Sequence, residues 1–260
     1  MTGINTEIPE EERQPTRRGA AEKPRTFDQT FLDTEKQDIV HRDYLAHAFR
    51  WGFAKDHYIE HEKTRVLDVG CGPNRPLMTV LFGGIGTKLA KSYVGVDMSD
   101  IKPTRHKRTT LYPKTNFLTS WPEIAEEHGP FDLITCFEVI EHMPRAEGDQ
   151  LLDVFSSVLD DDGVVLLSTP VYDGARAKNH IHEYTVPELQ HAVWRANFHV
   201  IKRYGTFMNH HEVKRLASPA QWEVYEQLRE YYSQEIMATF LAPLFPDHSR
   251  NNLWVLEHAK

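Results

Sequence analysis

The sequence predicts a doubly wound α/β fold with a mostly parallel sheet, and three observations support this prediction. Short apolar runs alternate with helical patterns through most of the chain, which is the order typical of a parallel sheet covered by helices on both faces. One of these runs leads directly into a glycine-containing turn, and the next ends in an acid, Asp97. The length of 260 residues suits one such domain with added helices better than two independent domains.

Seven segments are expected to form strands, because each is a short run of apolar, β-branched or aromatic residues bounded by turn residues. We expect these strands at residues 65–69, 92–96, 115–118, 131–137, 163–168, 198–207 and 252–257.

Apolar residues that recur three or four positions apart predict the helices. The start of one helix is marked by Thr185, Pro187 and Glu188, which have the spacing of a capping box with a proline in the first turn. We expect helices at residues 34–61, 148–159, 185–196 and 219–240.

The chain divides into three parts. Residues 1–26 are rich in charge and proline and lack apolar periodicity, which predicts a disordered tail without chemistry. Residues 27–62 are expected to be an N-terminal helical segment that packs on the domain or acts as a lid. Residues 63–260 form the α/β domain, with a helical insertion at about 209–250 before the last strand.

Composition predicts a cytoplasmic protein that binds no membrane. No apolar stretch approaches the roughly 18 residues of a membrane span, and the first 25 residues contain no apolar signal region. Cys71 and Cys136 lack the spacing of a zinc or redox pair. A formal net charge of −8 argues against an extended surface for polyanions. The basic residues between positions 102 and 108 are expected to form a solvated loop.

A nucleotide site is indicated at the ends of the first two strands. Asp68, Gly70 and Gly72 form an acid-x-Gly-x-Gly turn after the first strand, where glycines allow positive φ and close approach of a ligand. Asp97 ends the second strand, where a carboxylate can accept hydrogen bonds from both ribose hydroxyls. Two signals at adjacent strand ends are more specific than a lone glycine turn.

A dehydrogenase is the alternative for such a turn, but its pattern has a third glycine beside the pyrophosphate. This sequence has Arg75 at that position. Asp68 would also repel a pyrophosphate, whereas it could receive the ammonium of an amino-acid group. A ligand that joins adenosine to methionine suits this charge pattern.

On these residues the chain resembles the class I S-adenosylmethionine-dependent methyltransferases, over about residues 64–204. The resemblance implies a seven-stranded sheet with an antiparallel last strand, and S-adenosylmethionine as cofactor. It also implies a role for each residue of the site. Asp68, Gly70 and Gly72 would line the methionine side, Asp97 would bind the ribose, Asn116 and Phe117 would lie near the adenine, and Glu138 would border the cofactor.

A cluster of acids and a histidine follows the fourth strand. Glu138, Glu141 and His142 are spaced i, i+3 and i+4, so one helical turn would gather them on one face. Such a cluster can bind a divalent metal or deprotonate a nucleophile.

Two narrower resemblances interpret this cluster differently. Similar residues border the cofactor or substrate in metal-free quinone-precursor O-methyltransferases. The stretch from Asn179 to Thr185 is instead similar to the His-x-x-Glu-aromatic-Thr stretch of RNA 3′-terminal 2′-O-methyltransferases. That resemblance implies a metal site, with Mg²⁺ or Mn²⁺ as the suitable ion. Its ligands would be Glu138, Glu141, His142 and His180.

The sequence therefore predicts methyl transfer, with O-methylation of a small molecule as the expected reaction. Without a metal, His180 or His182 would be the base, together with Glu138 and His142 in the catalytic cluster. The 219–240 helix, with its aromatic residues, is expected to form a wall over the acceptor. A nucleic-acid acceptor, a nucleotide-binding module without catalysis and an oxidoreductase remain as alternatives. The oligomeric state is not indicated.

Overall fold

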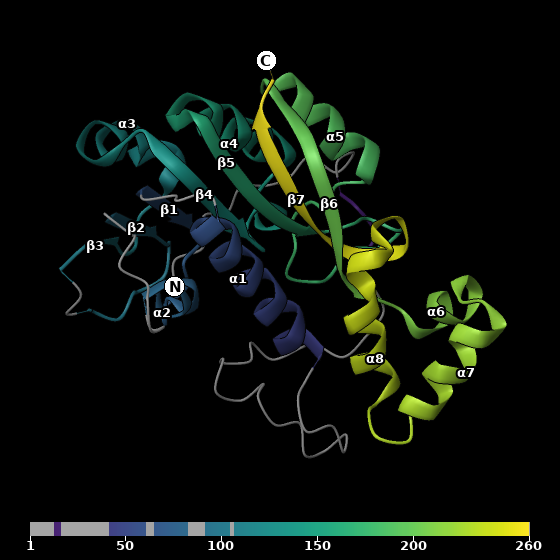
Figure 1. The fold of residues 1–260 in the computed structure, drawn as a ribbon. Coiled ribbons are helices and arrows are strands. Elements are labelled where there is room, and N and C mark those ends of the chain that lie inside the picture. Colours follow the sequence, from purple (N-terminus) through teal and green to yellow (C-terminus); the bar gives the residue numbers. More distant parts are fainter. Residues whose placement is uncertain (1–12, 17–41, 61–64, 83–91, 105–106, 260) are drawn as a thin grey trace.

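The computed structural model describes residues 13–16, 42–60, 65–82, 92–104 and 107–259. The strands are β1 (Arg65–Val69), β2 (Ser92–Val96), β3 (Thr109–Tyr112), β4 (Phe131–Phe137), β5 (Leu159–Pro170), β6 (Phe198–Met208) and β7 (Ser249–His258). They form one sheet in the order β3-β2-β1-β4-β5-β7-β6 (Figure 1). β7 is antiparallel to β5 and β6, and all other neighbours are parallel. The doubly wound fold with an antiparallel last strand is confirmed.

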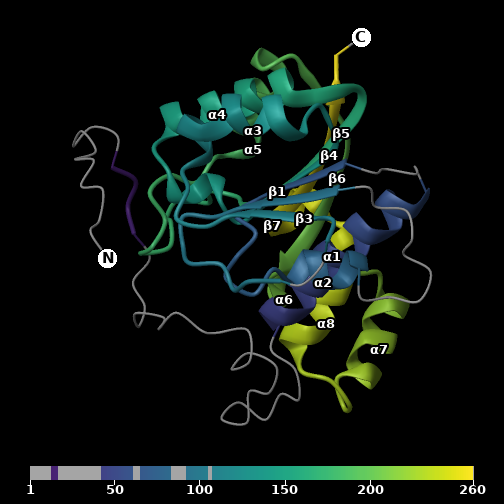
Figure 2. The ribbon, with the colours of Figure 1, turned by 90° about the vertical axis from the view of Figure 1, so that its left-hand side faces the viewer.

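Helices cover both faces of this sheet (Figure 2). They are α1 (Arg42–Glu60), α2 (Pro76–Phe82), α3 (Phe117–His128), α4 (Arg145–Val158), α5 (Val186–Arg195), α6 (His210–Leu216), α7 (Pro219–Leu228) and α8 (Gln234–Leu241). One core joins the sheet to α3, α4 and α5, and a second joins it to α1 and α2. Leu67 lies in the first core and Val66 in the second, because successive side chains of a strand point to opposite faces. The sheet is therefore buried on both sides.

The prediction of a strand at residues 115–118 is wrong. The third strand is β3, at Thr109–Tyr112, and Asn116 is the N-cap of α3, where its side chain accepts from Leu118 N–H. The prediction followed the short apolar run and missed the capping signal, because asparagine before a helix satisfies a backbone donor that a strand would pair elsewhere. The other six predicted strands occur, with ends shifted by up to a few residues.

The capping box at the start of α5 is confirmed. The Thr185 side chain accepts from the backbone of Glu188, and the Glu188 side chain accepts from the backbone N–H of Thr185. Of the first predicted helix, residues 42–60 form α1, and residues 34–41 lie outside the described part of the chain.

Three helices, rather than one, occupy the insertion between β6 and β7. α6, α7 and α8 share a small core of their own, and α8 also packs against α1 and β6. Met208, Tyr225 and Met237 are buried there. Within the described ranges, no helix is both long and apolar enough to cross a membrane.

Residues 13–16, which fall within the predicted disordered tail, contact the loop between β5 and α5. Thr16 forms an isolated parallel bridge with Arg176. The division of the chain into a tail, a helical segment and a domain stays a prediction.

Candidate functional site

The segments after the parallel strands enclose two neighbouring cavities at the carboxyl edge of the sheet, where α/β folds bind ligands. The glycine-turn cavity has a volume of about 260 Å³ and lies beside the turn after β1. The histidine cavity has a volume of about 410 Å³. Glu138 and His142 line both, so the two cavities meet at the segment that follows β4.

Both glycines of the turn after β1 have the left-handed backbone that the sequence suggested. The φ angles are 76° at Gly70 and 70° at Gly72. A Cβ atom at Gly70 would lie 2.2 Å from Val139 Cγ2. Gly70 therefore meets two needs at once, since a larger residue would be strained and would also collide with the opposite wall of the cavity.

Asp97 lines the glycine-turn cavity at the end of β2. Its Oδ2 accepts from Gly72 N–H at 2.7 Å, and its Oδ1 accepts from both the backbone N–H and the hydroxyl of Ser99. A carboxylate has about four lone-pair sites. Asp97 therefore braces the glycine turn and keeps about one acceptor site for the cavity.

Asp68 and Gly72 do not line this cavity. Asp68 is 4% exposed and accepts from the Tyr93 hydroxyl and, at 2.9 Å, from Thr135 Oγ1. Burial raises the pKa of Asp68 to about 6, although both hydrogen bonds act to lower it. In this position Asp68 ties β1 to β2 and β4, and the contact with a ligand ammonium stays a prediction.

Asn116 and Phe117 line the cavity, as predicted, but from a helix start instead of a strand end. The Asn116 Oδ1 accepts from Leu118 N–H at 3.0 Å. Apolar side chains, including Met143 and Leu151, form another part of the lining. The cavity thus combines a carboxylate at one side with an apolar surface at another.

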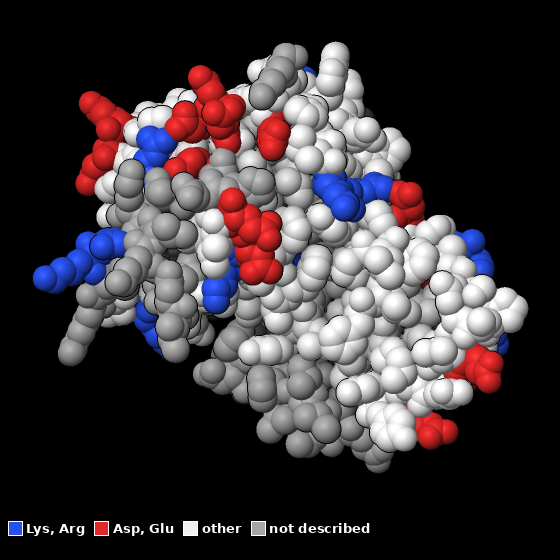
Figure 3. Space-filling view, in the orientation of Figure 1, with Lys and Arg blue, Asp and Glu red and all other residues white. Residues whose placement is uncertain are grey.

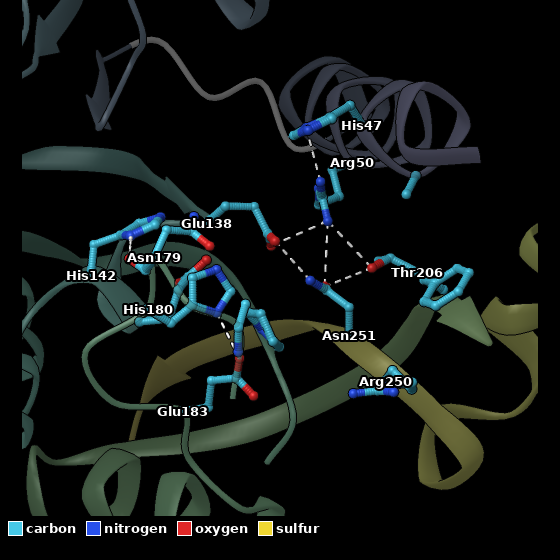
Figure 4. Close-up of a pocket in the computed structure, with 15 residues that line it drawn as sticks. His47, Arg50, Glu138, His142, Asn179, His180, Glu183, Thr206, Arg250 and Asn251 are labelled. Carbon is cyan, nitrogen blue, oxygen red and sulfur yellow. Dashed lines mark hydrogen bonds and ion pairs between the residues drawn. The ribbon is translucent and has the colours of Figure 1, made fainter. Parts of the chain in front are cut away.

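The histidine cavity is built from segments far apart in the sequence (Figure 4). α1 contributes His47 and Arg50, the loop after β5 contributes His180, and the ends of β6 and β7 contribute Thr206 and Asn251. The cavity therefore exists only when α1 is packed on the sheet.

Glu138 does not share a helical turn with Glu141 and His142, contrary to the prediction. Its φ is 59°, and it precedes a short 3-10 turn at Ile140–His142. This left-handed residue directs its side chain toward Arg50 and Asn251 (Figure 4). Backbone strain of this kind persists only where the surrounding structure holds it.

Glu138 is held in its ionised form. Burial would raise the pKa of Glu138, but the Arg50 guanidinium, His47 and hydrogen bonds from Ser168 and Asn251 together hold it below its usual value. The hydrogen bonds from Ser168 Oγ and Asn251 Nδ2 are both 2.8 Å long. The carboxylate therefore accepts hydrogen bonds from the polar groups around Arg50.

Glu141, His142 and His180 converge. One ligand atom from each lies within 4.8 Å of the other two. Glu141 is 1% exposed, and its Oε2 accepts from Thr169 Oγ1 at 3.2 Å, whereas its buried Oε1 has no hydrogen-bond partner among the described residues. Burial and the neighbouring Glu138 raise the pKa of Glu141 well above its usual value. A buried acceptor without a donor is the feature that a cation would satisfy.

Both histidines are oriented by hydrogen bonds on the Nδ1 side of the ring. His180 Nδ1 lies 2.6 Å from Glu183 Oε1, and His142 Nδ1 lies 3.0 Å from the Asn179 carbonyl oxygen. Because both partners accept, each Nδ1 carries a proton, so in the neutral ring the lone pair lies on Nε2. Metal-binding histidines have this arrangement, so the donor set fits a divalent cation.

The remaining predicted residues lie elsewhere. His182 packs edge to face on Tyr184 and does not line the histidine cavity. In the insertion, Trp222 and Tyr225 stack with each other beside His210. Among the described residues, none from 219–240 lines either cavity, so the expected aromatic wall is wrong. α1 and the ends of β6 and β7 take that place.

Arg50, Asn251 and Gln14 are not among the residues predicted from the sequence. Arg50 could have been found from its spacing, because it lies four residues after Ala46 and four before Ala54, on the face of α1 that is buried. A charge on a buried helix face needs a partner. No local pattern indicated Asn251 or Gln14, since Asn251 bonds Thr206, 45 positions away, and Glu138, 113 positions away, and Gln14 bonds Glu183, 169 positions away.

Comparison with known proteins gives the family. Residues 33–227 match the family described as a methyltransferase domain. The ubiquinone biosynthesis O-methyltransferase of Rickettsia canadensis is 29% identical over 118 residues, which are 44% of this chain and 45% of that protein. The match thus spans less than half of the curated relative.

Solved structures agree on the fold. The small RNA methyltransferase HEN1 superposes with a TM-score of 0.53 at 16% identity, over 82% of this chain and 26% of that chain. The [4+2]-cyclase SpnF superposes with a TM-score of 0.52 at 14% identity, over 81% of this chain and 80% of that chain. A cyclase among these neighbours shows that the fold alone does not decide the reaction.

Proposed function

Because this chain belongs to the family of methyltransferase domains, we propose that it transfers the methyl group of S-adenosylmethionine to a hydroxyl oxygen of an acceptor. The glycine-turn cavity would hold the cofactor, and the histidine cavity would hold the acceptor. The observation that carries this proposal is the shared wall, since Glu138 and His142 line both cavities.

Methyl transfer needs little from the protein besides placement of the two reactants. The sulfonium is already activated, and the acceptor atom attacks the methyl carbon in line as the carbon–sulfur bond breaks. Two cavities that meet at one segment suit this geometry. The acceptor atom would reach the methyl group across the junction at Glu138 and His142.

The lining of the glycine-turn cavity supports S-adenosylmethionine. Asp97 keeps an acceptor site for a ribose hydroxyl, and a second site would become free if the Ser99 hydroxyl turned away. Phe117, Met143 and Leu151 offer an apolar surface for the adenine. Gly70 allows the methionine part to approach the backbone closely.

A hydroxyl acceptor is favoured because the histidine cavity holds groups that can remove a proton. The Nδ1 atoms of His142 and His180 are bonded elsewhere, so the lone pair of each neutral ring lies on Nε2. Burial, with His180 nearby, lowers the pKa of His142, which keeps it neutral and able to accept a proton at neutral pH. When a hydroxyl attacks the methyl carbon, its proton would pass to one of these nitrogens.

Glu141, His142 and His180 also form a fitting set for Mg²⁺ or Mn²⁺, because they offer carboxylate and imidazole donors and because no described residue bonds the buried Glu141 Oε1. A divalent cation would lower the pKa of an acceptor hydroxyl that it coordinates. Glu138 would stay outside this set, because it is bonded to Arg50 and Asn251.

Two acceptor classes follow from these observations. A small hydroxylated molecule is favoured by the volume of about 410 Å³ and by the name of the Rickettsia relative. An RNA 2′-hydroxyl is the second candidate, favoured by the convergence of Glu141, His142 and His180. Among the described residues on the face shown in Figure 3, Lys and Arg lie in small separate groups and form no continuous patch, so we place the small molecule first.

The test has two steps. Calorimetry with S-adenosylhomocysteine asks whether the cofactor binds, and labelled S-adenosylmethionine is then offered with a panel of phenols, catechols and short RNA oligonucleotides. Methylation of a phenol or catechol supports the first candidate, and methylation of RNA alone supports the second. Failure to bind S-adenosylhomocysteine would overturn the proposal.

A further inference from the structure

The loop between β5 and α5 carries His180 and Glu183, so its conformation decides whether His180 faces Glu141. Part of this loop is fixed by the main body of the domain, because Ile181 N–H donates to the Glu141 carbonyl at 2.8 Å. Glu183 itself is 1% exposed and bonds His180 Nδ1. The backbone of Glu183 is held by a different part of the chain.

That part is the segment 13–16. Gln14 Nε2 donates to the Glu183 carbonyl at 2.8 Å, and Glu183 N–H donates to Gln14 Oε1 at 2.9 Å. One side-chain amide thus pairs with both backbone groups of one residue, 169 positions away. Next to it, Arg176 N–H donates to the Pro15 carbonyl at 2.9 Å.

Glu183 transmits this contact to the histidine cavity. Its Oε1 accepts from Ala177 N–H at 2.8 Å and bonds His180 Nδ1 at 2.6 Å. The resulting chain runs from Gln14 through Glu183 to His180. Glutamine suits the first position because its amide carries a donor and an acceptor side by side.

We propose that Gln14 is a positioning residue, which holds the backbone of Glu183 so that Glu183 orients His180 toward Glu141 and His142. The N-terminal segment 13–16 is thereby part of the active site, although it touches neither cavity. The expected effect on turnover rests on the proposed methyl transfer, whereas the effect on the loop does not.

Hydrogen exchange of the full-length protein tests the proposal directly. In Gln14→Ala, the amides of Arg176 and Glu183 should exchange about tenfold faster, because their hydrogen-bond partners are loosened and lost, respectively. Gln14→Leu, which keeps the side-chain size but not the amide, should behave in the same way. Wild-type exchange in either variant would overturn the proposal.

Kinetics separate positioning from general destabilisation. In Gln14→Ala, kcat should fall about tenfold, while the Kd for S-adenosylhomocysteine and the Tm stay close to those of the wild type. Gln227→Ala, an exposed glutamine on α7, should change none of these quantities. A loss of cofactor affinity equal to the loss of kcat would overturn the assignment. If the wild type methylates no acceptor, the proposed function fails, and the exchange measurement still decides the role of Gln14.

Discussion

Arg50 Nη1 donates to Glu138 Oε1 at 3.2 Å, which joins a helix that precedes the sheet to the turn after β4. The Arg50 side chain is 3% exposed and that of Glu138 is 24% exposed. Nη1 also lies 3.3 Å from Thr206 Oγ1 and from Asn251 Oδ1. One buried guanidinium therefore links α1, β4, β6 and β7 around the histidine cavity.

Arg50→Met should destabilise the protein by about 3 kcal/mol, because it leaves the partly buried Glu138 without its cation. Urea unfolding measures the free energy of unfolding. Arg195→Met is the matched control, since Arg195 pairs with Asp153 at side-chain exposures of 42% and 47%, and its loss should cost less than about 1 kcal/mol. Arg50→Met with Glu138→Gln should recover part of the stability. Equal effects of the two arginine substitutions would contradict the role given to Arg50.

Asp97→Ala should weaken binding of S-adenosylhomocysteine by about 1.5–3 kcal/mol, the range for hydrogen bonds to a charged acceptor. Calorimetry provides the Kd. Asp100→Ala is the control, because Asp100 is exposed and pairs with Lys114 at the surface, and it should leave the Kd unchanged. An unaltered Kd in Asp97→Ala would remove the ribose assignment.

Asp68 should make the stability of the free protein depend on pH. Its folded pKa is raised from 3.8 to about 6, so its contribution is complete below the unfolded pKa and is lost as the pH rises through the folded pKa. In Asp68→Asn the side chain at this position does not ionise, so the variant does not lose this stability as the pH rises. The free energy of unfolding of Asp68→Asn relative to wild type should therefore rise by about 2 kcal/mol between about pH 4.5 and 7.

Urea titrations across this pH range provide the comparison for Asp68. Any constant difference between Asn and Asp cancels, because only the change with pH is used. If the difference in free energy of unfolding between Asp68→Asn and wild type does not change with pH over this range, the pKa of Asp68 is not raised to about 6.

The sequence predicted best what local patterns determine. The strands around Asp68 and Asp97 and the cap at Thr185 each depend on residues within one short segment, and all of them occur. The prediction of the third strand failed because Asn116 caps a helix, although the apolar residues around it suggested a strand.

The site was predictable only in part, for a similar reason. Glu141, His142 and His180 could be grouped because the ends of parallel strands meet at one edge. The direction of the Glu138 side chain could not be predicted, since it depends on the positive φ of Glu138 and on Arg50, 88 positions away. Nor could the sequence choose between His180 and His182, because Glu183 and Tyr184 decide which ring faces the cavity.

Chelation should reduce turnover if Glu141, His142 and His180 hold a divalent cation during the reaction. We expect activity to be lost in EDTA and restored by added Mn²⁺ or Mg²⁺. Metal analysis of the purified protein should find about one ion per chain in wild type. S-adenosylhomocysteine should bind equally well with and without EDTA, because the glycine-turn cavity does not include Glu141 or His180.

Two substitutions make the metal prediction specific to these residues. Glu141→Gln keeps the size of the side chain but removes the anionic ligand, so it should abolish metal binding and turnover while sparing cofactor affinity. Glu183 bonds His180 Nδ1 without belonging to the proposed ligand set, so Glu183→Gln should weaken metal binding by roughly 10–100-fold. Glu126→Gln, on the exposed side of α3, should change neither quantity. Undiminished turnover of the wild type in EDTA would reject the metal, and His180 or His142 would then accept the proton of the acceptor hydroxyl directly.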